Sequence, residues 1–402
     1  MTKKMTFSAD IRFIHMDPVN FQDFPVGGTL SFSRQLIGQF KGSVALVGLV
    51  TDESDPVGKW FMKDINEISY PYFGIGRFKK SGKKPLIPIR LQTFLYLLFY
   101  LPKIRAINNR NVFTQSPQFL FALNMFRWNS LCYCFAGITN SVANSRYKYL
   151  RFSGIVYEKM LFKILKKKAS VILAAADQKA IKEANARTGN ILSDKTIYTF
   201  PTRFDPLVFS PANKAECRQK LNIDKDVFLL VTTGRLSWVK GWQLLIDATM
   251  ELYSMDKYKN VKIVFAGEGE DKAKIEKYNK LLFDNNIIQL PGKLNQADLA
   301  LYLNACDVFV MGSLFEGWPT SLVEAMACGC AIVTTNVSAA TEIVCEDKNG
   351  YLVYDRDPVI FAKTIEKALT LKDVMEYSLK NRDKFSVIYL KNDLEKLWLS
   401  KV

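Results

Sequence analysis

Short apolar runs alternate along most of the chain with longer stretches of helical spacing. In the first half the runs span residues 11–15, 43–50, 67–73, 111–115, 130–135 and 170–175. In the second half they span residues 227–233, 261–266, 287–293, 307–311 and 331–335. Buried strands separated by helices are typical of parallel sheets that are covered on both faces. The pattern therefore predicts an α/β fold.

A proline-rich stretch without periodicity interrupts this alternation. Residues 199–211 contain Pro201, Pro206 and Pro211 and match a linker. A chain of 402 residues also exceeds one ordinary hydrophobic core. We predict a first domain over residues 1–203, a second domain over residues 204–385 and a C-terminal helix within residues 386–402.

The excess positive charge lies in the first half of the chain. The net charge is +16, but residues 1–200 hold 29 Lys and Arg against 12 Asp and Glu, or +17, so the remainder carries −1. Such a one-sided field indicates a polyanionic partner: nucleic acid, an anionic membrane surface or a phosphorylated substrate. The charge gathers in a loop at 77–84, a helix at 157–168 and three residues upstream of that helix, Arg146, Lys148 and Arg151.

The helix at 157–168 places Leu, Phe and Ile on one side and lysines on the other. It can lie on an anionic membrane, or pack its apolar face on its own sheet, and both interpretations stay open. The longest apolar run, residues 91–101, is too short to span a bilayer, and we interpret it as a buried helix rather than an interfacial one.

Composition and cysteine usage indicate a globular cytoplasmic protein. Hydrophobic residues make up 49% and charged residues 23%, which excludes a disordered chain. Seven cysteines without a C-x-x-C pair argue against a disulfide framework or a zinc site. The N-terminus leads into no apolar core of the signal-peptide type.

Two glutamates eight positions apart are the first indication of a ligand-binding site. Glu316 follows the apolar run 307–311, a Gly-Trp-Pro turn comes next, and Glu324 falls in the first turns of a helical stretch. Both carboxylates should therefore lie at the carboxyl ends of parallel strands, where open α/β sheets bind ligands. A helix N-terminus favours an anion there, and a carboxylate accepts hydrogen bonds from sugar hydroxyls. This combination suits a sugar nucleotide.

Other signals lie on similar strand-to-helix loops. Arg235 and Lys240 share the loop after the run 227–233, a strong arrangement for a pyrophosphate, with ordinary surface charge as the alternative. Gly27, Gly28 and Gly269 lie in glycine turns after two other runs. They are weaker signals of a phosphate site, and plain turns stay as the alternative.

Residues 316–329, which read E-G-W-P-T-S-L-V-E-A-M-A-C-G, resemble the signature of the family 4 retaining glycosyltransferases of the group 1 type. Residues 234–241, G-R-L-S-W-V-K-G, match that family's diphosphate-binding loop. The resemblance implies the GT-B fold, in which two Rossmann-like parallel-sheet domains face each other across a cleft. It also implies that the first domain holds the acceptor and faces the membrane, that the second domain binds the nucleotide sugar, and that the C-terminal helix crosses back to the first domain.

The resemblance further implies roles for single residues. Arg235 and Lys240 would neutralise the leaving diphosphate, and Glu324 would hold the ribose. Glu316 would bind the donor sugar, helped by the backbone N–H groups of Gly317 and Trp318. The remaining donor-binding positions would be Gly27, Gly28, Gly269 and Lys293. One departure is Ala136, which occupies the position where many members carry a histidine; the only histidine here, His15, is interpreted as a packed residue.

By resemblance, the protein is a metal-independent hexosyltransferase without a cofactor. It would move a hexose from a nucleotide sugar, a UDP-sugar by expectation, to a lipid-linked glycan. The setting would be surface polysaccharide or lipopolysaccharide biosynthesis on the inner face of the plasma membrane, with no nucleic-acid partner. Two alternatives stay open: a sugar-nucleotide 2-epimerase of GT-B architecture, and a basic nucleic-acid- or membrane-binding protein without transferase activity.

Overall fold

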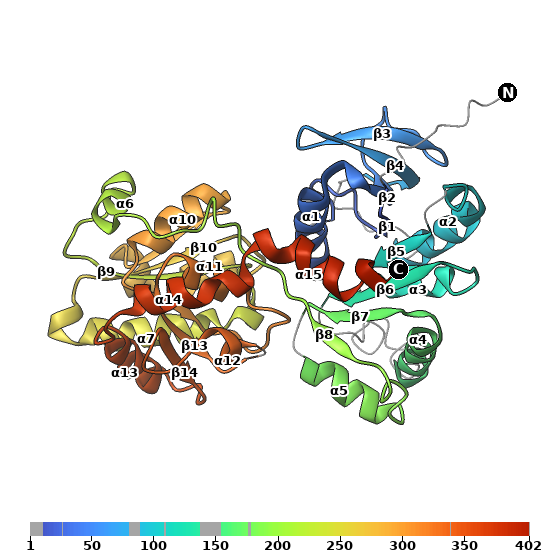
Figure 1. Ribbon diagram of the computed structural model, residues 1–402. Coiled ribbons are helices and arrows are strands. Elements are labelled where there is room, and N and C mark those ends of the chain that lie inside the picture. Colours follow the sequence, from blue (N-terminus) through green and yellow to red (C-terminus); the bar gives the residue numbers. More distant parts are fainter. Residues whose placement is uncertain are drawn as a thin grey trace. The chain divides into compact units, whose positions relative to one another are not determined.

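The chain folds into two compact units. The computed structural model describes residues 11–25, 27–79, 89–107, 110–136, 154–175, 178–337 and 339–401. Met1–Thr202 and Ile388–Val402 form the first unit, and Arg203–Val387 form the second (Figure 1). Each unit contains its own sheet.

The first unit is built on an eight-stranded sheet with the order β3-β4-β2-β1-β5-β6-β7-β8. Its strands are β1 (Phe13–Met16), β2 (Val44–Val50), β3 (Trp60–Ile65), β4 (Ile68–Arg77), β5 (Asn111–Thr114), β6 (Ser130–Phe135), β7 (Val171–Ala174) and β8 (Ile197–Thr199). β3 runs antiparallel to β4, and the other pairs are parallel. Central β2 is buried along its whole length, as expected for a parallel strand covered on both faces.

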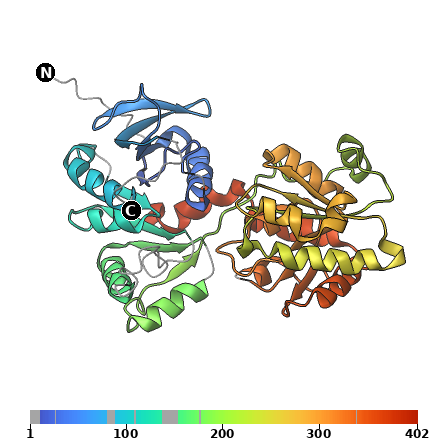
Figure 2. The ribbon, with the colours of Figure 1, turned by 180° about the vertical axis from the view of Figure 1, so that it is seen from behind.

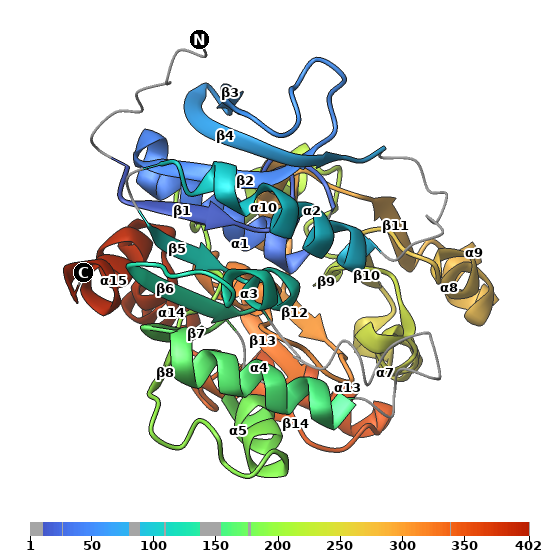
Figure 3. The same ribbon diagram turned by 90° about the vertical axis from the view of Figure 1, so that its right-hand side faces the viewer.

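Helices cover both faces of this sheet (Figures 1 and 3). One face carries α1 (Gly28–Phe40) and α15 (Leu390–Leu397), which contact each other. The other face carries α2 (Ile89–Ile104), α3 (Pro117–Leu123), α4 (Gly154–Lys168) and α5 (Gln178–Arg187). These four helices share one hydrophobic core with the sheet.

The C-terminal segment belongs to the first unit. Trp398, just after α15, is completely buried. Its indole Nε1 donates to Ser130 Oγ over 2.7 Å, and its ring lies 5.4 Å from that of Phe13. The segment thereby closes the face of the sheet that α1 covers.

Helix α2 is only half as buried as the sequence suggested. Leu97 and Leu101 are fully buried in the core, whereas Leu91, Leu95 and Phe99 are exposed, Phe99 at 73%. The interpretation of this run as a buried helix is correct for one face and wrong for the other. None of the described helices has both the length and the apolarity needed to cross a bilayer.

The second unit is built on a six-stranded parallel sheet with the order β11-β10-β9-β12-β13-β14. Its strands are β9 (Phe228–Thr233), β10 (Val261–Ala266), β11 (Ile288–Gly292), β12 (Val308–Met311), β13 (Ala331–Thr335) and β14 (Gly350–Val353). β14 pairs in parallel with β13 and forms one edge of the sheet.

Two layers of helices cover the second sheet (Figure 2). One layer contains α7 (Trp242–Ser254), α8 (Lys272–Tyr278), α9 (Lys280–Asp284) and α13 (Pro358–Ala368). The other contains α6 (Lys214–Lys220), α10 (Gln296–Ala305), α11 (Thr320–Ala327), α12 (Ala340–Ile343) and α14 (Val374–Arg382). Along β9, Phe228 and Leu230 face the first layer, while Leu229 and Val231 face the second. The predicted α/β fold is confirmed in both units.

Candidate active site

The candidate site lies at the carboxyl ends of two adjacent strands of the second unit, β9 and β12. The loop after β9 spans residues 234–241 and includes a short 3₁₀ helix, η3 (Trp238–Lys240). The loop after β12 spans residues 312–319. The backbone N–H of Leu314 donates to the carbonyl of Val239 over 2.8 Å, so the two loops are joined directly.

Gly241 allows this close approach. It has a left-handed backbone with φ of 62°, and a Cβ placed on it would stand 1.8 Å from the carbonyl oxygen of Gly312. Only glycine accepts both the conformation and the contact. The glycine that ends the G-R-L-S-W-V-K-G motif therefore determines how near Lys240 comes to the β12 loop.

Lys240 and Glu316 form an ion pair where the loops meet. Lys240 Nζ lies 2.6 Å from Glu316 Oε1, with side-chain exposures of 30% and 10%. Ser313 Oγ donates to the same oxygen over 2.6 Å. Charge-assisted hydrogen bonds of this kind are short and strong, and they hold Glu316 in one orientation.

Ser313 was missed by the sequence reasoning. The signal that could have found it is its position three residues before Glu316 on the same loop. Its carbonyl is in turn held by Thr335 Oγ1 at 2.7 Å and by Arg356 Nη1 at 3.2 Å. Burial lowers the pKa of the Arg356 guanidinium.

Arg235 lies on the same loop as Lys240 but is 75% exposed. Its Nε is 3.4 Å from Glu270 Oε2, on the turn that follows β10. Gly269 on that turn packs against the backbone of Leu236, where a Cβ would stand 2.2 Å from the carbonyl oxygen. Arg235 and Lys240 both line one small pocket at the end of β9. Two cations thus line one pocket, and each lies beside a carboxylate.

Glu324 lies in α11, whose N-terminus has no side-chain cap. Burial raises the pKa of its carboxyl to about 8, and no hydrogen bond or ion pair from the described residues offsets that burial. A carboxyl group in this state gains from any hydroxyl that donates to it. The carboxyl oxygens of Glu324, the predicted ribose-binding residue, can therefore accept hydrogen bonds from a ligand.

Two other predicted residues lie near Glu316 along the chain. Gly317 and Trp318 follow it directly and precede α11. The ring of Trp318 packs 5.7 Å from that of Phe385, and its Nε1 is buried without a hydrogen-bond partner in the described part of the chain. Lys293, by contrast, follows β11 as an exposed residue, and no printed contact brings it to Lys240 or Glu316.

Gly27 and Gly28 belong to the first unit, at the start of α1. A Cβ on either would meet nothing within 4 Å, so crowding inside the unit does not require glycine there. The preceding loop is held by buried Asn20, whose Oδ1 accepts from the backbone N–H groups of Gln22, Asp23 and Phe24. The N-terminus of α1 therefore has free space beside Gly27 and Gly28, and hydrogen bonds to Asn20 hold residues 22–24 of the preceding loop.

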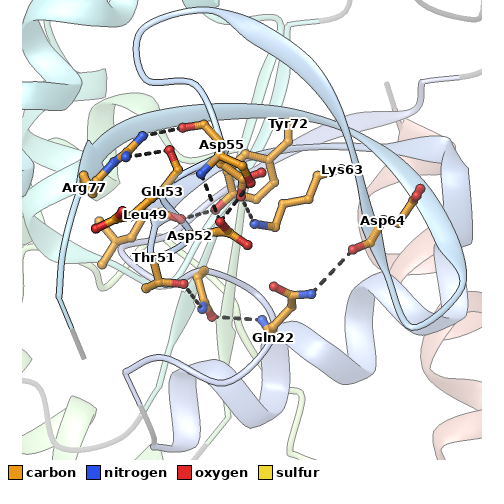
Figure 4. A network of polar contacts seen from close by, with 12 residues as sticks. Gln22, Leu49, Thr51, Asp52, Glu53, Asp55, Lys63, Asp64, Tyr72 and Arg77 are labelled. Carbon is orange, nitrogen blue, oxygen red and sulfur yellow. Dashed lines mark hydrogen bonds and ion pairs between the residues drawn. The ribbon is translucent and has the colours of Figure 1, made fainter. Parts of the chain in front are cut away.

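The loop after β2 is fixed by a second polar network (Figure 4). Lys63 pairs with Asp55, and Arg77 donates to the carbonyls of Glu53 and Asp55 over 2.7 and 2.6 Å. Asn20 Nδ2 donates to Thr51 Oγ1 over 3.0 Å and links this network to the β1–α1 loop. These contacts order the carboxyl edge of the first sheet.

His15 is a structural residue, as the sequence interpretation expected. It is fully buried, and its Nε2 lies 2.8 Å from Asp17 Oδ2 and 3.2 Å from Ser33 Oγ. A Ser–His–Asp relay uses the two ring nitrogens for two different partners, whereas here one nitrogen meets both. Gln115 Nε2 donates to Asp17 over 3.0 Å and to the Thr29 carbonyl over 3.2 Å, which anchors α1.

The remaining sequence predictions have mixed standing. Helix α4 confirms the predicted amphipathic helix at 157–168. Ala136 is exposed directly after β6. Residues 80–84 of the basic loop, and Arg146, Lys148 and Arg151, lie outside the described residues. All seven cysteines are free, and all but Cys345 are buried.

Comparison with known proteins places the second unit in a family. Residues 213–385 match the family model described as glycosyl transferases group 1. The second unit carries a glycosyl transferases group 1 domain. The matched segment contains every site residue named above except those of the first unit, so the resemblance drawn from the sequence is confirmed at the level of group 1.

Several curated relatives of this chain are glycosyltransferases by name. An uncharacterized glycosyltransferase of Methanocaldococcus jannaschii is 27% identical over 210 residues, which is 51% of this chain and 53% of that protein. The chain spans about half the length, or less, of the first curated relatives it matches.

Two solved structures show the fold of the whole chain. Sucrose-phosphate synthase from Thermosynechococcus elongatus has a TM-score of 0.72 at 17% identity, covering 97% of this chain and 99% of its own. HepE of Anabaena, solved in complex with UDP-glucose, has a TM-score of 0.67 at 16% identity, covering 97% and 99%. At these identities the likeness shows the fold alone, which is GT-B.

Proposed function

We propose that this protein is a retaining glycosyltransferase of family 4 that transfers a hexose from a nucleotide sugar to a glycan acceptor. The observation that carries the proposal is the ion pair between Lys240 and Glu316 at the carboxyl ends of β9 and β12. It places a cation suited to a phosphate beside a carboxylate suited to sugar hydroxyls. A UDP-sugar is the expected donor, in line with the neighbour solved with UDP-glucose.

The two cations would act on the leaving diphosphate. As the bond between the anomeric carbon and the phosphate oxygen breaks, negative charge grows on the diphosphate. Arg235 and Lys240 stabilise that charge more in the transition state than in the ground state, which accelerates the reaction. Because they supply positive charge themselves, we expect activity without a divalent metal.

The two glutamates would hold the donor on either side of the diphosphate. Glu324 accepts hydrogen bonds from the ribose hydroxyls, and Glu316 accepts from hydroxyls of the transferred hexose. In a retaining transfer the acceptor hydroxyl attacks the face that the diphosphate leaves. Its proton passes to the departing phosphate oxygen, so the protein need not supply a nucleophile. Glu316 also favours the positive charge that develops near the anomeric carbon.

We further propose that the protein works at the inner face of the plasma membrane on a lipid-linked glycan. α2 and α4 both contact α3 and lie in one layer of the first unit (Figure 3). Their outer sides expose apolar residues: Leu91, Leu95, Tyr96 and Phe99 on α2, and Ile155, Val156 and Met160 on α4. Four exposed lysines of α4 accompany them: Lys159, Lys163, Lys166 and Lys167. Apolar and basic side chains together suit anionic lipid.

Vesicle binding tests this attachment. Phe99→Ser and the double change Lys163→Glu with Lys167→Glu should each weaken cosedimentation with phosphatidylglycerol-containing vesicles by at least about fivefold. Leu207→Ser, a change at an exposed residue of the second unit, is the matched control. Equal binding to pure phosphatidylcholine, or no effect of the variants, contradicts the attachment.

Thermal unfolding with a panel of UDP, GDP and their sugars tests the donor site. A nucleotide at a hundred times its Kd should add about 2.7 kcal/mol to the free energy of unfolding. Glu324→Ala should abolish that shift, while Glu376→Ala, at an exposed residue of α14, should keep it. If no nucleotide shifts the midpoint but duplex DNA does, the transferase proposal fails and a nucleic-acid role takes its place.

A further inference from the structure

The chain passes between its two units at two places, and the two passing segments are hydrogen-bonded to each other inside the second unit. The chain enters this unit at Arg203 and leaves it after Val387. The backbone N–H of Phe204 donates to the Phe385 carbonyl over 3.0 Å, and that of Val387 donates to the Phe204 carbonyl over 2.9 Å. Arg203 Nη1 also donates to the Ser386 carbonyl over 3.3 Å. We call residues 203–204 and 385–387 the crossing pair.

Helix α11 is attached to the crossing pair at both of its ends. Just before its N-terminus, the ring of Trp318 lies 5.7 Å from that of Phe385. At its C-terminus, the Ala327 carbonyl accepts a hydrogen bond from Arg382 Nη1 over 2.7 Å. The Arg382 guanidinium in turn lies 5.9 Å from the centre of the Phe204 ring. Both phenylalanines are buried in the same hydrophobic core as α11. Because such a core is closely packed, a shift of α11 would disturb the crossing pair.

The same helix and the turn before it carry the groups that the proposed function assigns to the donor. Glu316 and Gly317 directly precede Trp318, and Glu324 lies in the second turn of α11. The Trp318 carbonyl accepts from the N–H of Thr320, the first residue of α11, over 2.9 Å. Trp318 therefore has the donor-binding groups next to it in the chain, while its ring packs on the crossing pair.

We propose that Trp318 is a positioning residue that couples the donor site to the crossing pair. A bound nucleotide sugar would restrain Glu316 and α11, and the contact between Trp318 and Phe385 would pass that restraint to the segments through which the chain leaves the second unit. The inference rests on the proposed function and adds the route by which donor binding reaches the connection between the units. A packed contact of this kind is a physical link between two sites, and its coupling can be measured.

Hydrogen exchange followed by mass spectrometry tests this coupling. The N–H groups of Phe204 and Val387 hold the crossing pair together, so their exchange reports its opening. Saturation with UDP or GDP, whichever raises the unfolding midpoint more, should slow exchange in peptides containing these residues by about fivefold or more in the wild type. Trp318→Ala should bind the same nucleotide with an affinity within about threefold of the wild type but lose this slowing.

Three further variants separate positioning from a general loss of stability. Trp318→Phe keeps an aromatic ring against Phe385 and should restore the slowing. Phe385→Leu removes the ring on the other side of the contact and should behave like Trp318→Ala, so the test does not depend on the folding of one variant. Tyr258→Ala is the matched control: it removes a ring that lies 4.9 Å from Phe228 at the amino end of β9, and it should keep the wild-type response.

The outcomes distinguish the coupling from the proposed function. Slowed exchange that persists in both Trp318→Ala and Phe385→Leu overturns the coupling, as does a wild type that binds the nucleotide without any slowing at the crossing pair. A wild type that binds neither UDP nor GDP contradicts the proposed transferase, and the coupling with it.

Discussion

Lys240 and Glu316 lie 76 positions apart in the sequence, yet the ammonium nitrogen of one is 2.6 Å from a carboxylate oxygen of the other. Each comes from the loop after its own strand, and the strands are neighbours in the sheet. Parallel strands bring their carboxyl ends to one edge, which is how distant charged residues meet. The pair joins the parts of the site proposed to bind phosphate and sugar.

Glu316→Gln should separate turnover from nucleotide binding. The amide keeps the shape of the side chain but loses the charge that would act near the anomeric carbon. We expect UDP affinity to stay within about threefold, or to improve because Lys240 is freed, and turnover to fall by about 10²-fold or more. Calorimetry and the rate of nucleotide release from the donor measure the two effects. Similar losses in both would contradict the role given to Glu316.

Glu324 should make the fold less stable as the pH rises. Its pKa in the folded protein is about 8, against the ordinary 4.5, because the carboxyl is buried. Between these values the folded state holds a proton that the unfolded state has released, so the free energy of unfolding falls with increasing pH. Glu324→Gln has no such proton to lose. Between these two pH values its free energy of unfolding should therefore exceed that of the wild type increasingly, by up to about 5 kcal/mol.

Denaturant unfolding of both proteins at pH 5 and pH 8.5 measures this difference. Glu376→Gln, at an exposed residue of α14, should track the wild type at both values. If the difference in free energy of unfolding between the wild type and Glu324→Gln were the same at both pH values, the raised pKa of Glu324 would be contradicted.

Gly241→Ala should destabilise the second unit severely. The new Cβ would meet the Gly312 carbonyl at 1.8 Å and would sit on a left-handed backbone. We expect a loss of more than about 3 kcal/mol. Gly38→Ala, inside α1 with nothing near its Cβ position, is the contrasting change and should be neutral or stabilising by about 0.5–1 kcal/mol. An unfolding midpoint for Gly241→Ala equal to that of the wild type would contradict the close loop contact.

Much of the fold was readable because buried parallel strands are continuous apolar runs. β2, β9 and β12 are of this kind. β3 was missed because its sequence, W-F-M-K-D-I, mixes apolar and charged residues on a partly exposed edge strand. β14 was not predicted as a strand of the sheet because its run is only four residues long.

The sequence predicted which residues belong to the site but not which atoms contact one another. Motif spacing pointed to Arg235, Lys240, Glu316 and Glu324. It could not show that Lys240 and Ser313 both donate to Glu316 Oε1, or that Arg235 forms an ion pair with Glu270. Those contacts depend on the twist of the sheet and on two backbones meeting at Gly241 and Gly312.

Calorimetric titration of UDP into three proteins tests the central claim most directly: the wild type, Lys240→Ala, and Lys280→Ala, which removes an exposed lysine of α9. If the β9 loop binds the diphosphate, the wild type binds UDP, Lys280→Ala binds equally well, and Lys240→Ala binds about ten- to a hundredfold more weakly. UDP affinity that is the same in Lys240→Ala as in the wild type, with all three proteins folded, would contradict the account.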